Sequence, residues 1–304
     1  TLKTWLPVDF YLIGEEHIVL HLLYSRFFTK FLRDEGYLDL PSGEPFAKMR
    51  HQGMILGPDG KKMSKSKGNV INPDEIIQEY GADTLRIYEM FMGPLEADKP
   101  WNPRAVAGVS RFLRKVYRLV NREIARHQDS SLSLLSDRQQ LVQKLHSTIY
   151  KLTLDLPELK YNTAIAALME FANLWEKMDA DDVLLLETEE IVAFIKLLAP
   201  LAPFIAEELY DQAKVLGFSA QKSVHLESWP AYDQALLQKE FTNLVVQVNG
   251  KLRAQFAWPT KNLTDQAAIL SQAKNLEAMQ KWLTGKTIHK EIYVFGKIVN
   301  FVAS

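Results

Sequence analysis

The 304-residue sequence contains no cysteine, which excludes disulfide bonds and metal sites built on thiolates. It has no apolar run long enough to cross a membrane, and it opens on no signal-peptide pattern. The net charge is only −1, so a surface for nucleic acid has to be a local patch. With 47% hydrophobic and 24% charged residues, we expect a globular, cytoplasmic protein without contact to a membrane.

The chain opens on Thr1, and its first segment has the pattern of a domain interior. We therefore expect a piece of a longer protein, or one subunit of a split protein. The length allows two or three domains, and the hydrophobic pattern divides the sequence into three regions: 1–102, 103–235 and 236–304.

The first region, residues 1–102, alternates short apolar runs with helical patterns. The pattern predicts, in order, a strand over 10–14, a helix over 16–35 and a strand over 52–56. This order is typical of parallel α/β sheets, whose ligand sites follow the strand ends. A helix should start after Asn72, because Pro73 suits the first turn and Glu75 stands three residues after the cap.

The second region, residues 103–235, is helical almost throughout and predicts an all-α bundle. Its helices are expected around 109–124, 139–154, 162–178 and 187–216. Pro200 and Pro203 lie inside the last of these apolar runs, so we expect a kink or a break there.

The third region, residues 236–304, changes to a period of two and predicts a small α+β domain. Strands over 244–248 and 252–256 flank Asn249-Gly250, a hairpin turn signal. A helix over 265–283 and a second strand pair, 292–295 and 298–302, complete the pattern. From residue 241 onwards this region has eight Lys or Arg against three Asp or Glu, a net charge of +5.

Residues 61–69 form a lysine loop that carries four lysines within seven positions. Cations on a flexible tether suit the binding of a phosphate group whose charge shifts during a reaction. A solvated lysine run or a localisation patch is the alternative for an arbitrary basic stretch. A Walker A loop is excluded, because no Gly stands five residues before Gly60 and no Ser or Thr follows Lys61.

A second group of functional candidates lies after the first predicted strand. Gly14 allows a ligand to approach the backbone, and Glu16 can accept hydrogen bonds from ribose hydroxyls. His17 and His21 stand four residues apart on one helix face, which fits structural histidines, pocket walls or a pair of metal ligands. No third ligand occurs at a recognisable spacing, so we expect no zinc or other metal site in this portion.

The order Lys62-Met63-Ser64-Lys65-Ser66 resembles the KMSKS loop of class I aminoacyl-tRNA synthetases. Further segments are similar to leucyl-tRNA synthetases of the bacterial type: 5–11, 14–21, 52–56, 80–86, 90–95, 198–204 and 247–253. The resemblance covers nearly the whole chain. It implies the second half of a class I Rossmann domain with a stem-contact element, a helical anticodon-binding bundle, and a C-terminal α+β domain.

The resemblance also implies roles for single residues. Lys62 and Lys65 would be the catalytic cations that neutralise the ATP phosphates. ATP would be bound by Gly14, Glu16, Gly53, Met54, Ile55, Ser64 and Lys65. The leucine side chain would be bound by Tyr11, His17 and His21.

Three departures from the family pattern stand out. Ile13 occupies a position where the family usually has a first glycine, and the short link 57–60 lacks the domain that some members insert before the loop. The His-x-Gly-His motif, the family's other phosphate-binding element, does not occur, and no segment resembles the editing domain. We therefore expect half a catalytic site, which forms no leucyl-adenylate on its own.

A basic stripe follows one face of the helix predicted around 109–124. Its members are spaced by three, four or seven residues: Arg104, Arg111, Lys115, Arg118, Arg122 and Arg126. The stripe is either a solvated outer face or a track for RNA phosphates, and acidic partners four residues away are nearly absent. The family context favours tRNA binding by Arg111, Lys115, Arg118 and Arg122, with Lys251 and Arg253 as candidates in the third region.

The sequence thus predicts part of a leucine–tRNA ligase. The whole enzyme would use ATP, with Mg²⁺, to activate leucine and would transfer it to tRNA(Leu); the missing N-terminal half would be a further partner. An isoleucyl- or valyl-type fragment shares the loop and the bundle, but the paired histidines disfavour it. A non-catalytic RNA-binding module would not need the lysine loop, and a nucleotidyltransferase acting without tRNA would leave the basic stripe unexplained.

Overall fold

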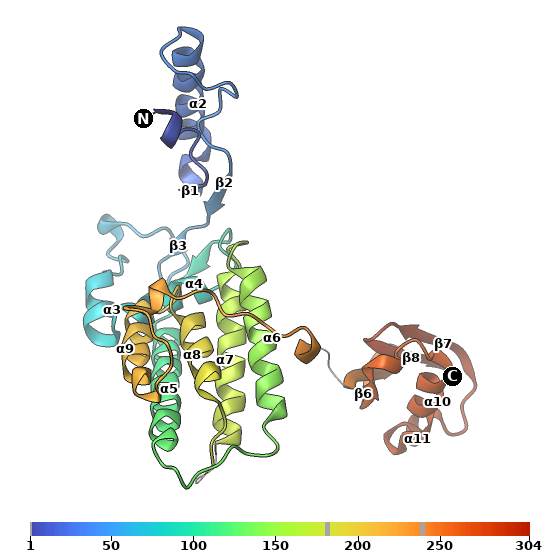
Figure 1. Cartoon of the computed structure of the whole chain (residues 1–304). Coiled ribbons are helices and arrows are strands. Elements are labelled where there is room, and N and C mark those ends of the chain that lie inside the picture. The colour runs from blue at the N-terminus through green and yellow to red at the C-terminus, as the bar shows by residue number, and fades with distance from the viewer. Residues whose placement is uncertain (1, 180–182, 238–240) are drawn as a thin grey trace. The chain divides into compact units, whose positions relative to one another are not determined.

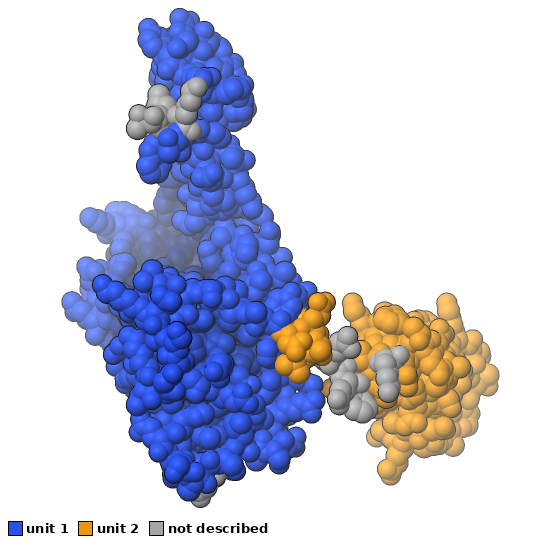
Figure 2. All heavy atoms as spheres, in the orientation of Figure 1, with its two compact units in different colours: residues 1–232 blue, residues 233–304 orange. Residues whose placement is uncertain are grey.

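The computed structural model describes residues 2–179, 183–237 and 241–304. They divide into two compact units, 1–232 and 233–304 (Figure 2), and each unit has a hydrophobic core of its own.

The first part of unit 1 contains two small parallel strand pairs (Figure 1). Its elements are α1 (Leu2–Trp5), β1 (Tyr11–Gly14), α2 (Ile18–Asp34), β2 (Met49–Gln52), β3 (Ile55–Leu56), α3 (Pro73–Tyr80), α4 (Ala82–Phe91) and β4 (Lys99–Pro100), with short 3-10 helices at Glu15–His17 and Lys65–Lys67. β1 pairs with β2, from Tyr11 opposite Met49 to Gly14 opposite Gln52, and β3 pairs with β4. The parallel pairing is the arrangement that the sequence predicted for this region.

The prediction of one continuous strand over 52–56 is wrong. The structure has two strands there, β2 ending at Gln52 and β3 beginning at Ile55, and the chain between them, Gly53 and Met54, is not in a strand. The Gly53 N–H donates to the Leu95 carbonyl (2.9 Å), and the Met54 N–H donates to the Asp98 carboxylate (2.6 Å). A Cβ at position 53 would lie 2.4 Å from the Ala97 backbone. The chain is therefore bound to the segment before β4 at this point, and a close approach that only glycine permits separates β2 from β3.

Two helices of unit 1 begin on the same local device. Asn72 accepts a hydrogen bond from the Asp74 N–H, and Asn102 accepts one from the Arg104 N–H, both at 3.1 Å. A proline follows each asparagine, where its missing N–H costs nothing. The helix start predicted at Asn72 is confirmed.

The second part of unit 1 is a helical bundle (Figure 1). It consists of α5 (Pro103–His127), α6 (Gln139–Asp155), α7 (Tyr161–Met178), α8 (Thr188–Leu198) and α9 (Pro203–Ala213), followed by 3-10 helices at Lys214–Leu216 and Val224–Leu226; the 3-10 helix Ala235–Leu237 belongs to unit 2. Phe171, Trp175 and Phe194 are fully buried at its centre, with ring centroids 4.8–5.8 Å apart. The break predicted at Pro200 and Pro203 is confirmed, since α8 ends at Leu198 and α9 begins at Pro203.

Helix α4 binds the chain at this break and so connects the two parts of unit 1. The buried Asp83 carboxylate accepts hydrogen bonds from the N–H groups of Phe204 (3.4 Å) and Ile205 (2.7 Å), at the start of α9. Burial raises the pKa of Asp83, although these two hydrogen bonds oppose the shift. Arg86 donates to the carbonyls of Pro200 (3.2 Å) and Leu201 (3.3 Å). These four contacts satisfy backbone groups that a broken helix leaves without partners.

Unit 2 is a four-stranded sheet with two short helices. Its elements are β5 (Phe241–Val248), β6 (Lys251–Pro259), α10 (Gln266–Asn275), α11 (Glu277–Leu283), β7 (Ile288–Val294) and β8 (Ile298–Ala303), and the strand order is β6-β5-β8-β7. Asn249 and Gly250 have φ of 49° and 77°, which confirms the predicted hairpin turn. The helix expected over 265–283 is two helices, because the backbone is extended at Leu276. Among the described residues, no helix combines the length and hydropathy needed to cross a membrane.

Candidate functional site

A cavity of about 560 Å³ lies at the carboxyl ends of β1 and β2, the edge at which parallel sheets bind ligands. Its lining includes five of the seven residues predicted to bind ATP, namely Gly14, Glu16, Gly53, Met54 and Ile55, together with His17; Ser64 and Lys65 are not among its lining residues. These residues come from two segments 36 or more positions apart, so the parallel pairing of β1 with β2 is what brings them together.

Two ionisable residues of the cavity whose pKa values are shifted were not among the predicted site residues. Glu89 on α4 and Lys99 on β4 both contribute to the lining. Burial raises the pKa of Glu89 and lowers the pKa of Lys99, the latter against the opposing charges of Glu96 and Asp98. Neither residue belongs to a recognisable motif, so no signal in the sequence could have identified it.

The lysine loop reaches this cavity through one ion pair. The Lys62 ammonium donates a hydrogen bond to the Glu16 carboxylate. Both side chains are about half exposed, so the pair is open to solvent. Lys65 lies on the exposed side of the loop, in the 3-10 helix Lys65–Lys67, and Ser64 precedes it with its hydroxyl 2.7 Å from that of Ser66.

Asn69 holds the base of the lysine loop. Its side-chain oxygen accepts a hydrogen bond from the Ser64 N–H (2.9 Å), and its amide nitrogen donates to the Asp59 carboxylate (3.2 Å) and to the Lys62 carbonyl (3.3 Å). The Lys61 N–H and Asn69 lower the pKa of Asp59. One side chain thus connects both arms of the loop with the turn before it. In the sequence, Asn69 stands out only as the last residue of the loop.

The two histidines have different surroundings. The Tyr11 hydroxyl lies 2.7 Å from Nε2 of His21, and the Tyr11 ring stacks on Phe46 with centroids 4.1 Å apart. His17 lines the cavity instead. In the described part of the chain, no group of three His, Cys, Asp or Glu residues is placed to hold a metal ion.

The basic stripe on α5 faces acidic residues on α7 and at its C-terminal end. Glu176 binds Lys115 and Arg118, both at 2.5 Å, and Asp179 binds Arg122 at 2.9 Å. Lys115 is the main cause of the lowered pKa of Glu176. Arg126, the last member of the stripe, is buried and lies 2.8 Å from Asp179. Acidic partners are nearly absent four residues away along the helix, as the sequence indicated, but the fold supplies partners that lie more than 50 residues away in the sequence.

Three arginines of α5 differ from these paired cations. Arg104, Arg111 and Arg114 are exposed, and within the described ranges no carboxylate lies within ion-pair distance of any of them. In unit 2, Lys251 is exposed, whereas the Arg253 guanidinium stacks on the Trp282 ring at 3.5 Å from its centroid. The cations therefore divide into paired, stacked and unpaired groups.

Two family models match separate stretches of the chain. Residues 1–101 match the model of tRNA synthetases class I (I, L, M and V), and residues 138–269, which extend from the bundle into unit 2, match that of the anticodon-binding domain of tRNA ligase. The chain thus contains a segment similar to class I tRNA synthetases, followed by a segment similar to anticodon-binding domains.

One relative that is similar to the chain over nearly its whole length is a leucine–tRNA ligase. The chain is 45% identical over 301 residues to the leucine–tRNA ligase of Chlorobium chlorochromatii (strain CaD3), and the match covers 98% of this chain and 35% of that protein. A LeuRS of Agrobacterium radiobacter K84, crystallised as a ternary complex with tRNA and LeuAMS, superposes with a TM-score of 0.75 at 32% identity, over 98% of this chain and 38% of that one. The chain is therefore a homologue of leucine–tRNA ligase, and it spans about a third of the length of this relative.

A more distant structure shares the fold alone. The methionyl-tRNA synthetase of Mycobacterium tuberculosis, bound by methionyl-adenylate, superposes with a TM-score of 0.54 at 17% identity, over 69% of this chain and 45% of that one.

Proposed function

We propose that this chain is the KMSKS-bearing, tRNA-binding portion of a leucine–tRNA ligase, which activates leucine with ATP and transfers it to tRNA(Leu). One observation carries the proposal: the Lys62–Glu16 ion pair brings the lysine loop to a cavity at the carboxyl ends of two parallel strands. The predicted adenosine-contacting residues line that same cavity, and the homology with leucine–tRNA ligase over 98% of the chain supports the choice of amino acid.

In the activation step, a leucine carboxylate oxygen forms a bond to the α-phosphorus of ATP, and the bond to pyrophosphate breaks. Lys62 and Lys65 neutralise the charge that develops on the phosphates, an effect worth about 3–4 kcal/mol for a preorganised donor. Lys62 exchanges its contact with Glu16 for a phosphate when ATP enters. Glu16 is then free to accept hydrogen bonds from the ribose hydroxyls. Gly14, Gly53, Met54 and Ile55, which line the cavity, complete the adenosine contacts, and Ser64 adds a hydroxyl near the phosphates.

The leucine pocket is proposed around Tyr11, His17 and His21. The hydrogen bond between Tyr11 and His21 fixes both rings, which suits the wall of a pocket. Mg²⁺ is proposed to arrive with ATP. In nucleotide sites Mg²⁺ keeps water molecules and phosphate oxygens as ligands. An ion held by its nucleotide therefore needs no cluster of three His, Cys, Asp or Glu residues, and the described ranges contain none. The ion would assist in charge neutralisation.

The remaining part of the catalytic domain is proposed to cover helix α2. None of the 17 residues of α2 is buried. Even its large apolar side chains are open to solvent, since Leu20, Leu23, Phe27 and Phe28 are each more than half exposed. An apolar surface of this kind marks an interface. Because the chain spans about a third of its relative, we assign this surface to the N-terminal polypeptide, whether it is part of the same chain or a separate subunit.

The tRNA is proposed to contact the bundle and unit 2. We propose that the chain has three functional segments, 1–102, 103–235 and 236–304. We also propose a cytoplasmic location for the enzyme. The candidates on α5 are Arg111, Lys115, Arg118 and Arg122. Glu176 pairs with Lys115 and Arg118, and Asp179 pairs with Arg122, so Arg111 is the most accessible phosphate contact of the four. Lys251 offers a free ammonium in unit 2, and Arg253 presents its guanidinium as a plane over Trp282.

Leucine-dependent exchange between ATP and pyrophosphate tests the function. The chain alone should be inactive, because it holds half of the phosphate-binding elements. Mixing it with the N-terminal polypeptide of a leucine–tRNA ligase should restore exchange with leucine but not with isoleucine or valine. Exchange by the chain alone, or a preference for isoleucine or valine after mixing, would refute the proposal.

A further inference from the structure

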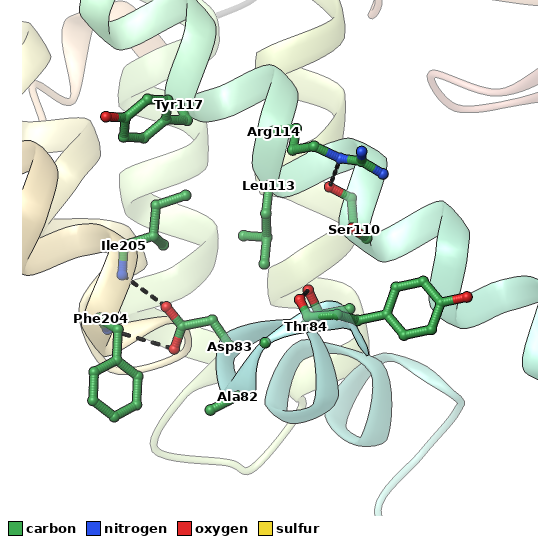
Figure 3. A pocket seen from close by; sticks show the side chains of 11 residues that line it. Ala82, Asp83, Thr84, Ser110, Leu113, Arg114, Tyr117, Phe204 and Ile205 are labelled. Atoms are coloured by element: carbon green, nitrogen blue, oxygen red, sulfur yellow. Dashed lines mark hydrogen bonds between the residues drawn. The ribbon is translucent and has the colours of Figure 1, made fainter. Parts of the chain in front are cut away.

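A second hollow, of about 510 Å³, lies where the turn between α3 and α4 meets α5 and α9. Figure 3 shows Asp83 at one end of it, bound to the N–H groups of Phe204 and Ile205. Leu113 and Tyr117 on α5 lie opposite Ile205 on α9 (Figure 3). The helices α3, α4, α5 and α9 all belong to unit 1. None of the residues that line the hollow was assigned to a site from the sequence.

The walls of this hollow are apolar and partly aromatic, yet they are open to solvent. Phe204 is 68% exposed and Tyr117 is 40% exposed. The Phe204 N–H is bound by Asp83, so the backbone places this largely exposed aromatic side chain at the rim of the hollow, where its ring is open to stacking.

The charge around the hollow is positive on the α5 side. Arg114 lines it, with Nε 3.5 Å from the Ser110 carbonyl, and Arg111 precedes it by one turn. Both are among the unpaired arginines described above. The acidic residues that follow Phe204 on α9 are already engaged: Glu207 accepts from Ser223 and Val224, Glu208 from Gln212, and Asp211 from Lys214.

We propose that this hollow binds an unpaired base of the tRNA, which stacks on Phe204 while Arg114 and Arg111 contact the flanking phosphates. Unstacked RNA bases are typically bound on aromatic rings and guanidinium planes, and base stacking adds to phosphate contacts in single-strand binding. A free anion would use the arginines but leave the apolar walls unused. An apolar peptide would use the walls but leave two unpaired cations beside it. The inference rests on the proposed tRNA-binding function and assigns it a specific site.

The experiment uses the full chain and transcripts of tRNA(Leu) that carry 2-aminopurine at one unpaired position each, because this base loses fluorescence when it stacks. Binding should quench the signal at one position. Phe204→Ala should abolish that quenching and weaken binding about ten-fold, whereas Phe204→Tyr should preserve both. Arg114→Gln should lower the slope of log K against log[salt] by about 1. Tyr37→Ala, at an exposed aromatic residue away from the hollow, is the matched control and should change neither quantity.

The outcomes separate this site from the proposed function. If the wild-type chain does not bind the transcript, the proposed tRNA binding fails, and this inference fails with it. If the wild type binds but no position responds to Phe204→Ala, the inference alone is overturned. It is also overturned if Phe204→Ala leaves RNA binding intact and instead weakens association with the N-terminal polypeptide, since the occupant is then a protein. Because the Phe204 side chain is largely exposed, the variant should fold, and circular dichroism of each variant checks this.

Discussion

The Lys62 ammonium and the Glu16 carboxylate, 46 residues apart, share a hydrogen bond at the mouth of the cavity. Each is a charged group that the proposed chemistry directs to a different part of ATP, Lys62 to the phosphates and Glu16 to the ribose. In the free protein they satisfy one another. ATP binding therefore replaces a solvent-open ion pair, which is a small loss, because exposed pairs contribute about 0–1 kcal/mol.

Lys65→Ala should reduce the rate of leucyl-adenylate formation in the reconstituted enzyme by about 10²–10³-fold, because a preorganised cation on the transition-state phosphates is lost. ATP–pyrophosphate exchange measures this rate. Lys67→Ala is the matched control, because it removes a lysine from the same 3-10 helix. The fold-reduction in rate that it causes should be less than a tenth of the reduction caused by Lys65→Ala. Equal losses in both variants would show that the loop acts through net charge alone.

Asn69→Ala should slow adenylate formation about ten-fold while the midpoint of thermal unfolding stays unchanged. The side chain ties the Ser64 N–H to the Asp59 carboxylate and the Lys62 carbonyl, so its loss misplaces both catalytic lysines within an exposed loop. The split between kcat and thermal stability is the informative measurement. Asn69→Asp keeps the acceptor for Ser64 but places a second carboxylate beside Asp59, and it should also be impaired. Full activity of both variants would contradict a positioning role.

Tyr210→Phe should change the pH dependence of stability at high pH. Burial, and then the hydrogen bond to Glu227, raise the pKa of Tyr210 from 10.0 to about 12. A phenol whose pKa is raised on folding contributes stability that is fully present below pH 10 and is lost as the pH rises through about 12. Urea unfolding of the wild type should lose about 2 kcal/mol over this window beyond the loss in the variant. Parallel curves for the two proteins would contradict the assignment.

Glu176→Gln should strengthen binding of a tRNA(Leu) transcript by about two- to five-fold, because Glu176 competes with RNA phosphates for Lys115 and Arg118. The change should steepen the salt dependence, which filter binding over a range of salt concentrations measures. Glu170→Gln is the control. It removes a carboxylate from the same helix, but this carboxylate binds Lys144 and not a residue of the basic stripe. A weaker complex after Glu176→Gln would mean that these ion pairs serve the bundle and not RNA.

Several elements followed from the sequence because their causes are local. The cap at Asn72, the break at Pro200 and Pro203, and the turn at Asn249-Gly250 are each decided by residues within one helical turn. The interruption at Gly53 could not be predicted in the same way. It depends on a backbone segment 44 residues further along that approaches closely.

The candidate site shows the same division. The spacing of the lysines identified the loop, and the strand end at Gly14 identified one wall of the cavity. Glu89, Lys99 and Asn69 were not identified, because each acquires its position from a partner in a different element. The hollow beside Phe204 belongs to three elements at once and has no linear pattern.

By itself the sequence determined the order of elements, their caps and turns, and the cationic loop, since these depend on the conformational preferences of neighbouring residues. The tertiary structure decided which charges remain available. Lys115 and Arg118 look equivalent to Arg111 along the chain, but packing of α7 against α5 places Glu176 beside the first two and leaves Arg111 exposed. Electrostatic pairing depends on distance in space, and that distance is set by how the helices pack.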